Sequence, residues 1–295
     1  MADYRLVVTG ANAPLAQSLI KGLLTTGAGP ILGLISPWCD RSRLAADEDE
    51  LEYLATDLTT PLPAEAAEAV RAAGAVLHLA WVRSGDVETA TDRNLAILDN
   101  LAAAMDSMEK LYFMSSVAAG ADAPSAYGRS KYLIEERVRA LGGNVLVCGL
   151  VMSEPPQTAF KMLVGLTSKL PLAVRFVLGA PRVYPVALAD LDRGVRDTLT
   201  AAAPVGTVAF YRAGGVALNA FLKRLEARRG GVRLPLPLPA GPMLAVGRLA
   251  RHTPLKGLGE KIATFLYKDD RRLAALPPPP GLAFSETEAF LSADR

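Results

Sequence analysis

The sequence predicts an α/β fold with a doubly wound parallel sheet and a smaller C-terminal part. Short apolar segments at residues 6–8, 31–35 and 75–80 indicate buried strands, and helical segments separate them. Strands that are apolar along their whole length are typical of parallel sheets covered by helices on both faces. Polar residues and glycines repeatedly follow the strand ends, which is the edge where open α/β sheets bind ligands.

Strands and helices alternate regularly over the first half of the chain. After the first strand, an amphipathic helix places Leu15, Leu19 and Leu23 on one stripe. Further strands are expected near residues 31–35, 52–55, 75–80, 110–114 and 145–147, and further helices near 64–73, 89–105 and 127–141. This order predicts a Rossmann-type dinucleotide-binding domain over residues 1–150.

The pattern changes after residue 150. The stretch 152–186 is irregular and apolar, a strand is expected at 207–211, and an amphipathic helix is expected at 218–229. The remaining tail is rich in proline and loops. We expect residues 151–295 to be mainly a substrate-binding and capping region, with some segments returning to the first domain.

Composition narrows the class of protein. The chain has 295 residues, of which 51% are hydrophobic and 21% charged, and its net charge is +2. A charge this small gives no broad basic field, so we expect no nucleic-acid partner. The two cysteines cannot form a disulfide framework, and the first strand begins too early for a signal peptide. A cytoplasmic location is therefore expected.

The most apolar stretch, residues 162–186, is interrupted by charged residues and proline. A membrane span needs about 20 mostly apolar residues, so we expect no integral membrane segment. The stretch is interpreted as core or pocket lining, with an exposed partner-facing surface as the alternative.

Tyr127 and Lys131 form the most informative pair in the chain. Residues four apart share one face of a helix, so the Lys131 ammonium is expected beside the Tyr127 phenol. A neighbouring cation favours the phenolate and lowers its pKa from about 10. Ser116, at the end of the strand before this helix, could donate a hydrogen bond to a substrate oxygen. The alternatives are a buried tyrosine beside a surface lysine, and a serine that caps a turn.

Together with other segments in a fixed order, this pair resembles the extended short-chain dehydrogenase/reductase superfamily, which is epimerase- and dehydratase-like. The turn Thr-Gly-x-x-Gly-x-x-Gly of that family is similar to residues 9–16, in which only Gly10 is kept. The other segments that match family motifs are Asp57-Leu58, residues 78–81, Asn94, Asn100-Leu101, Ser115-Ser116, Tyr127 with Lys131, and residues 184–191.

The resemblance implies a nicotinamide cofactor, NAD or NADP, and a small-molecule substrate. It implies Ser116, Tyr127 and Lys131 as catalytic residues, and Ser116 and Arg182 as substrate-binding residues. The cofactor-binding residues that it implies are Gly10, Asn12, Ala13, Pro14, Leu15, Ser36, Arg41, Asp57, Leu58, Leu79, Ala80, Trp81, Asn94, Tyr127 and Lys131. A homodimer formed through the Asn94 and Tyr127 helices is also implied.

The chain departs from the family pattern in the phosphate-binding turn. Ala13 and Ala16 replace glycines that let the backbone approach the pyrophosphate and let the helix pack on its strand. Pro14 suits the first helical position, where a missing N–H has no cost. The N-terminus of this helix would still favour a phosphate. Cys148 stands where many relatives carry an arginine, which argues against a standard nucleotide-sugar pocket.

Cofactor preference depends on the end of the second strand. An acidic residue there holds the ribose 2′-hydroxyl of NAD, whereas arginines suit the 2′-phosphate of NADP. This chain has Ser36 at that position, followed by Arg41 and Arg43, so NADP is favoured. The alternative is that both arginines are solvated and that Asp40 reaches the ribose.

Four other polar residues have expected roles. His78 lies in an apolar strand and is expected to be a packed, hydrogen-bonded core residue. With His252 as the only other histidine, no metal cluster is expected. Asp190 is expected to cap or bridge, and Arg175 and Arg182 either grip an anionic substrate group or lie on the surface.

The sequence therefore predicts an NAD(P)-dependent oxidoreductase or epimerase that acts on a carbonyl or hydroxyl carbon by hydride transfer. A nucleotide sugar is the substrate class that the resemblance suggests. Dehydration is disfavoured, because residues 117–119 supply no acid or base. The alternative is a non-catalytic NAD(P)-binding regulator or scaffold with a degenerate glycine motif.

Overall fold

A seven-stranded sheet forms the centre of the molecule. The computed structural model describes residues 5–45, 50–84, 86–168, 172–179, 181–227, 234–250 and 256–285. The strands lie in the order β11-β6-β5-β4-β1-β2-β3, and every neighbouring pair is parallel. Their bounds are β1 (Leu6–Thr9), β2 (Ile31–Ile35), β3 (Leu51–Ala55), β4 (Ala75–His78), β5 (Leu111–Ser116), β6 (Asn144–Cys148) and β11 (Thr207–Phe210). The predicted Rossmann-type fold is confirmed.

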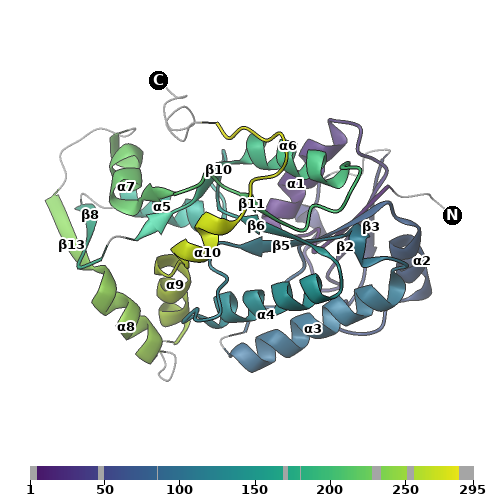
Figure 1. Cartoon of the computed structure of the whole chain (residues 1–295), viewed down its shortest axis with the longest axis horizontal. Coiled ribbons are helices and arrows are strands. Elements are labelled where there is room, and N and C mark those ends of the chain that lie inside the picture. Colours follow the sequence, from purple (N-terminus) through teal and green to yellow (C-terminus); the bar gives the residue numbers. More distant parts are fainter. Residues whose placement is uncertain are drawn as a thin grey trace.

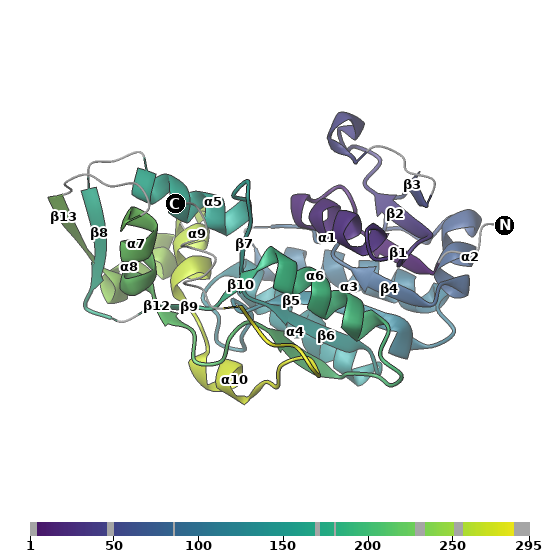
Figure 2. The ribbon, with the colours of Figure 1, turned by 90° about the horizontal axis from the view of Figure 1, so that it is seen from above.

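Helices cover both faces of this sheet (Figures 1 and 2). On one face lie α2 (Ala64–Ala72), α3 (Val87–Ala104) and α4 (Ala126–Ala140), and on the other lie α1 (Pro14–Leu24) and α6 (Leu188–Leu199). The two faces have separate apolar clusters: Val7 belongs to the first, and its neighbours Leu6 and Val8 belong to the second. Side chains alternate along a strand, so burial on both faces requires the continuous apolar segments seen in the sequence.

The C-terminal part has its own apolar core (Figure 1). It includes α5 (Thr158–Ser168), α7 (Leu218–Ala227), α8 (Ala240–Ala250), α9 (Lys256–Leu266) and the parallel pair β8 (Leu172–Val177) and β13 (Leu234–Pro239). Phe160, Phe176 and Phe221 are buried in this core. Each such side chain contributes about 1.5–3 kcal/mol when fully buried.

Short strands connect the two parts. A parallel pair joins β7 (Leu150–Met152) to β10 (Pro185–Ala187), and an antiparallel pair joins β9 (Arg182–Val183) to β12 (Val216–Ala217). The short elements η1 (Arg41–Arg43) and η2 (Met108–Lys110) are 3-10 turns, and α10 (Asp270–Ala275) is the last helix among the described residues. β11 returns to the central sheet beside β6.

Asp190 fastens the end of the described chain to α6. Its carboxylate accepts bonds from the Ser285 N–H at 2.6 Å and hydroxyl at 3.0 Å, and it pairs with Arg193 at 2.8 Å. Asp190 thus has a structural role, as expected, although its bonds go to Ser285 and within α6 rather than to the sheet.

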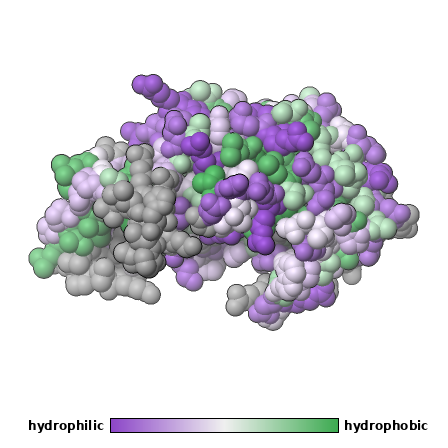
Figure 3. Space-filling view, turned by 90° about the horizontal axis from the view of Figure 1, so that it is seen from below, coloured by the Kyte–Doolittle hydropathy of each residue, from purple (hydrophilic) through white to green (hydrophobic). Residues whose placement is uncertain are grey.

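The apolar stretch 162–186 is divided between core and surface. Val174 and Phe176 are buried, whereas Met162, Val177 and Leu178 are exposed. Figure 3 shows apolar residues at the end of the molecule that the C-terminal part forms. Within the described ranges, no helix is both long and apolar enough to cross a membrane.

Candidate active site

Gly10 brings the ends of β1 and β4 together. Its φ is +66°, and a Cβ built on it would lie 2.6 Å from the backbone N and Cα of Ala80. Both the left-handed conformation and the contact exclude a side chain. Gly10 therefore lets the turn after β1 lie directly against the strand end that carries Leu79, Ala80 and Trp81.

His78 is part of the core, as expected. Its Nδ1 lies 2.7 Å from the hydroxyl oxygen of Thr9, and that oxygen also accepts the N–H of Ala80 at 3.2 Å. Burial, together with the nearby charge of Lys131, lowers the pKa of His78 to about 3. The imidazole is therefore neutral at physiological pH and holds two strand ends in place.

The N-terminus of α1 points its free N–H groups toward the same edge. Ala13 is the N-cap and gives no side-chain hydrogen bond, and Pro14 occupies the first helical position. The N–H groups of Leu15 and Ala16 have no partner within a helix of this kind. The methyl group of Ala16 is fully buried in the core. The alanines in the turn are thus packed into the fold, and the helix end retains donors for an anion.

Ser116 and Tyr127 lie next to each other at the carboxyl end of β5. The Ser116 hydroxyl acts on the Tyr127 phenol and lowers its pKa, and the Ser116 oxygen accepts the N–H of Ala118 at 3.2 Å. Tyr127 is the second residue of α4, which Ser125 caps through the N–H of Gly128 at 3.1 Å. The structure brings the two predicted residues together.

Gly128 allows this approach. A Cβ on Gly128 would lie 2.3 Å from the carbonyl oxygen of Ala118, so only glycine lets α4 pack this closely on the loop after β5. The sequence analysis did not identify Gly128 as a site residue, although it directly follows Tyr127.

Lys131 is buried one turn below Tyr127. Its ammonium donates to the carbonyl oxygen of Met114 at 2.7 Å and lies 4.0 Å from the Trp81 ring centroid and 4.3 Å from that of Phe113. Burial lowers the pKa of Lys131 to about 7, although the carboxylate of Glu135 acts in the opposite direction. Near neutral pH this ammonium is close to losing its charge.

The pKa of Tyr127 is raised, not lowered as the sequence analysis expected. Burial is the largest cause, and it outweighs the hydrogen bond from Ser116 and the charge of Arg83, which both lower the pKa. The rings of Trp81 and Tyr127 pack edge to face, with their centroids 5.9 Å apart and an interplanar angle of 79°. The Tyr127 phenol is therefore protonated at neutral pH and suited to donate a proton.

Asn94 holds the loop after β4. Its amide group donates to the carbonyl oxygens of Val82 at 2.8 Å and Ala90 at 2.6 Å, and its oxygen accepts the Val82 N–H at 3.0 Å. These bonds connect Asn94 to the loop backbone at Val82 and to Ala90 of its own helix.

Two acidic residues that the sequence analysis did not identify support α4. Glu135, four residues after Lys131 and fully buried, accepts hydrogen bonds from Ser115, Arg139 and Arg272. Glu260 of α9 accepts the N–H of Ala126 with both oxygens, at 3.1 and 2.9 Å. In the sequence, only the spacing of four residues between Lys131 and Glu135 could have indicated Glu135. No local pattern indicates Glu260.

The residues expected at the adenosine end lie at the ends of β2 and β3. The carboxylate of Asp57 accepts bonds from the N–H and hydroxyl of Thr59 at 3.0 and 2.7 Å, and Leu58 is buried. The backbone N–H of Ser36 donates to the side-chain oxygen of Asn12 at 3.4 Å. Arg41 is exposed at the start of η1. The side chain of Arg43 lies outside what the structure describes.

Asp40 and Cys148 are engaged in the fold. The Asp40 carboxylate accepts the N–H of Ser42 at 3.1 Å and its hydroxyl at 2.7 Å, which caps η1. Cys148 is buried near Lys131, and burial raises the pKa of its thiol to about 12. The thiol is therefore protonated and unreactive at neutral pH.

The two arginines proposed for substrate binding both contact the protein itself. Arg182 donates from Nε to the carbonyl oxygen of Gly214 at 2.7 Å, which fixes the turn before β12. Arg175 forms a two-pronged pair with Glu226 at 2.8 and 2.6 Å. Arg175 thus grips a carboxylate of its own chain, and Arg182 is exposed with part of its donor set engaged.

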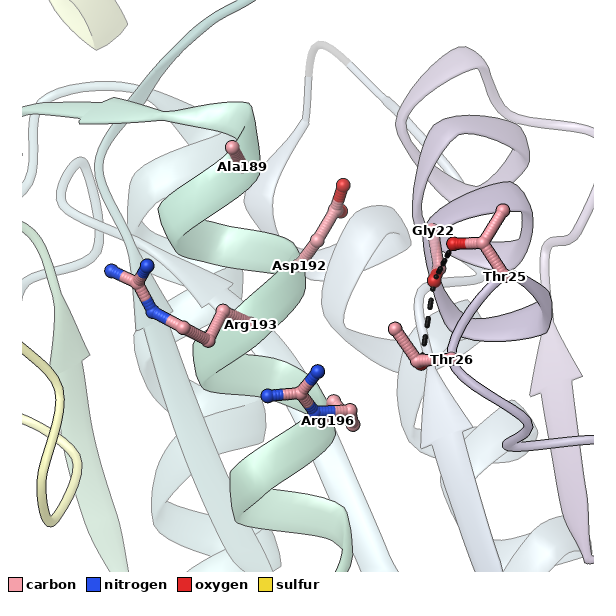
Figure 4. A pocket seen from close by; sticks show the side chains of 7 residues that line it. All are labelled: Gly22, Thr25, Thr26, Ala189, Asp192, Arg193 and Arg196. Carbon is pink, nitrogen blue, oxygen red and sulfur yellow. Dashed lines mark hydrogen bonds between the residues drawn. The ribbon is translucent and has the colours of Figure 1, made fainter.

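A separate pocket of about 230 Å³ lies between α1 and α6 (Figure 4). Its lining includes Asp192, Arg193 and Arg196, and none of the predicted site residues. One carboxylate oxygen of Asp192 is buried without a hydrogen-bond partner, and burial raises the pKa of Asp192 to about 7. Arg193 pairs with Asp190 and Arg196 pairs with Asp197, so neither neutralises Asp192 through an ion pair.

The described residues contain no group of three or more His, Cys, Asp or Glu side chains placed to hold a metal ion. His252 lies outside the described residues.

Solved structures share this fold, although no family model and no curated sequence matches the chain. A nucleoside-diphosphate-sugar epimerase from Staphylococcus aureus has a TM-score of 0.70 at 12% identity, covering 97% of this chain and 99% of that one. The terminal R domain from the myxalamid PKS-NRPS biosynthetic pathway has a TM-score of 0.67 at 16% identity, covering 99% and 90%. The UDP-glucose 4-epimerase of Thermus thermophilus, in complex with NAD, has a TM-score of 0.57 at 16% identity, covering 80% and 86%. The chain thus shares the Rossmann-type fold of these solved structures.

Proposed function

We propose that this chain is an NAD(P)-dependent oxidoreductase or epimerase that acts on a carbonyl or hydroxyl carbon. The observation that carries the proposal is that Ser116, at the carboxyl end of β5, lies beside a protonated Tyr127. Lys131 lies one helical turn after Tyr127 on α4. This is the arrangement that proton transfer at a substrate oxygen needs.

A nicotinamide cofactor fits the residues on this edge. The free N–H groups at the start of α1 suit a pyrophosphate, and Lys131 would hold the nicotinamide ribose. The indole N–H of Trp81 is buried without a partner, so it is a donor for an oxygen of a bound molecule. When bound, the cofactor supplies or removes the hydride.

The side chains of the chain perform the proton chemistry. Tyr127 donates its phenolic proton to the substrate oxygen during reduction and takes it back during oxidation. Ser116 donates a hydrogen bond to the same oxygen and limits its movement. Lys131, when charged, favours the phenolate that reduction leaves behind. Reduction and epimerisation both use these steps.

The C-terminal part is proposed to form the substrate side of the site, with Arg182 as a contact. The likeness of the fold to nucleotide-sugar epimerases supports a nucleotide sugar as the substrate. Arg41, in η1 after the second strand, supports NADP over NAD. We propose a homodimer through α3 and α4 on the strength of the family resemblance.

The test compares Tyr127→Phe with the wild type. Turnover of NADPH with a panel of carbonyl compounds and nucleotide sugars should fall at least about 100-fold, because general acid catalysis contributes about 10²–10⁴-fold. NADPH binding, followed by nicotinamide fluorescence, should remain. Tyr132→Phe, on the same helix, is the control and should keep turnover. A Tyr127→Phe variant with full turnover would refute the assignment.

A second candidate is a non-catalytic NAD(P)-binding regulator. The observation that favours it is the position of the Lys131 ammonium, which is bonded to Met114 and covered by two aromatic rings. NADPH or NADH binding that is tight, with no turnover of any compound in the panel, would support this candidate over the enzyme. Comparing the two dissociation constants also tests the preference for NADP.

A further inference from the structure

Arg83 faces the Tyr127 ring from the loop after β4. Its guanidinium carbon lies 5.7 Å from the ring centroid of Tyr127, and its side chain is exposed. Its positive charge acts on both Tyr127 and Lys131, lowering the pKa of each. Neither the motif comparison nor the fold assigns a role to this arginine.

The loop that carries Arg83 is fixed in place. Asn94 bonds both the N–H and the carbonyl oxygen of Val82, at 3.0 and 2.8 Å. Val82 lies between Trp81 and Arg83, and both of those side chains contact the Tyr127 ring. The position of Arg83 over the phenol therefore follows from a buried backbone clamp, which places the guanidinium beside any substrate oxygen held at Tyr127.

Within the described part of the chain, no acidic side chain pairs with Arg83. Among the described residues, Glu135 is the carboxylate that acts on Tyr127, and it already accepts bonds from Arg139 and Arg272. An exposed guanidinium beside the Tyr127 ring suits a carboxylate or phosphate oxygen, because its planar set of N–H donors matches both groups.

We propose that Arg83 is a specificity-determining residue that binds an anionic group, a carboxylate or a phosphate, close to the reacting carbon of the substrate. This inference rests on the proposed function, because it places the reacting oxygen at Tyr127. It narrows the substrate class to oxo or hydroxy compounds with an anionic group near the reacting carbon.

The first measurement is calorimetric binding, in the presence of NADP, of benzoate and of the neutral isostere benzamide. The wild type should bind benzoate at least about tenfold more tightly than benzamide, because charge-assisted hydrogen bonds to a guanidinium are the stronger kind. Arg83→Gln should lose this difference. Arg129→Gln, an exposed arginine on α4, is the matched control and should keep it.

The second measurement is NADPH turnover with benzoylformate and with its methyl ester. Arg83→Gln should raise KM for the acid about tenfold or more and leave that for the ester nearly unchanged. Equal binding of benzoate and benzamide by the wild type, or an unchanged preference in Arg83→Gln, would overturn the proposal.

Two further readouts separate the sources of failure. NADPH binding should be unchanged in Arg83→Gln, and a loss of NADPH affinity would show that Arg83 binds cofactor phosphate instead, which also overturns the proposal. The proposed function itself fails on a different result, full turnover by Tyr127→Phe, so the two hypotheses can be rejected separately.

Discussion

The Lys131 ammonium lies 4.0 Å from the centroid of the Trp81 ring, and this contact determines the state of the lysine. Together with Phe113, the indole shields the charge from water, so burial lowers the pKa of Lys131 to about 7. The cation–π contact of Lys131 is therefore accompanied by a desolvation cost to its charged form. The charge of Lys131 is present below about pH 7 and lost above it.

Replacing Trp81 with alanine should restore water to Lys131. The pKa of Lys131 should rise from about 7 toward the ordinary value near 10.4. The measurement is the pH dependence of Lys131 acetylation by acetic anhydride, quantified by peptide mass spectrometry. Trp81→Phe keeps a ring over the ammonium and is the control, with exposed Lys161 as the internal standard. The same labelling midpoint in Trp81→Ala and wild type would contradict this account.

Glu260 should stabilise the start of α4, although it lies 134 residues away in sequence. Its removal leaves the N–H of Ala126, the first residue of α4, without an acceptor. Glu260→Ala should therefore destabilise the protein by about 1 kcal/mol, the usual contribution of a helix cap. It should also lower kcat more than it changes KM, because Tyr127 follows Ala126 directly.

Thermal unfolding and steady-state kinetics measure these two effects. Glu260→Gln keeps an acceptor oxygen and should lie between alanine and wild type. Lys261→Ala, an exposed neighbour on α9, is the control. Equal kcat values for Glu260→Ala and Lys261→Ala would show that Glu260 does not position Tyr127.

Replacing Gly10 with alanine should destabilise the protein more than the same change at Gly27, which has a similar backbone conformation. Gly10 and Gly27 have φ values of +66° and +73°, but only at Gly10 would an added Cβ clash, at 2.6 Å from the backbone of Ala80. Gly27→Ala should cost about 1 kcal/mol, from the left-handed conformation alone. Gly10→Ala should cost about 3 kcal/mol or more, because overpacking adds to that strain. Urea unfolding of both variants measures the difference, and equal losses would show that the contact relaxes.

Asp192 should make stability depend on pH. Its pKa is raised by burial from 3.8 to about 7, so the folded state holds the proton more tightly than the unfolded state. This contribution is complete below about pH 4 and is lost as the pH rises through about 7. Asp192→Asn should therefore be more stable than wild type at pH 8, by about 1–2 kcal/mol after allowance for partial exposure, and similar to it at about pH 4.

Thermal melts at about pH 4 and about pH 8 test this dependence. Asp92→Asn, an exposed position on α3, should show no such pH-dependent gain and is the control. A wild-type advantage at the higher pH would mean that the Asp192 carboxylate finds a partner in the pocket of Figure 4.

The parallel sheet and the site residues on its edge could be predicted from the sequence. Apolar segments such as Ile31–Ile35 are legible because every residue of such a strand is buried on one face or the other. Ser116, Tyr127 and Lys131 could be found because two of them share a helix and the third ends the preceding strand. These relations are local, so spacing along the chain is enough to indicate them.

The environment of those residues depends on contacts that no local pattern records. Glu260 reaches Ala126, and Arg272 reaches Glu135, across 134 and 137 positions of sequence. The raised pKa of Tyr127 depends on how completely its surroundings exclude water, which outweighs the nearby positive charge of Arg83. Motif spacing determines which side chains meet, whereas the packing of distant segments determines their solvation and hence their protonation.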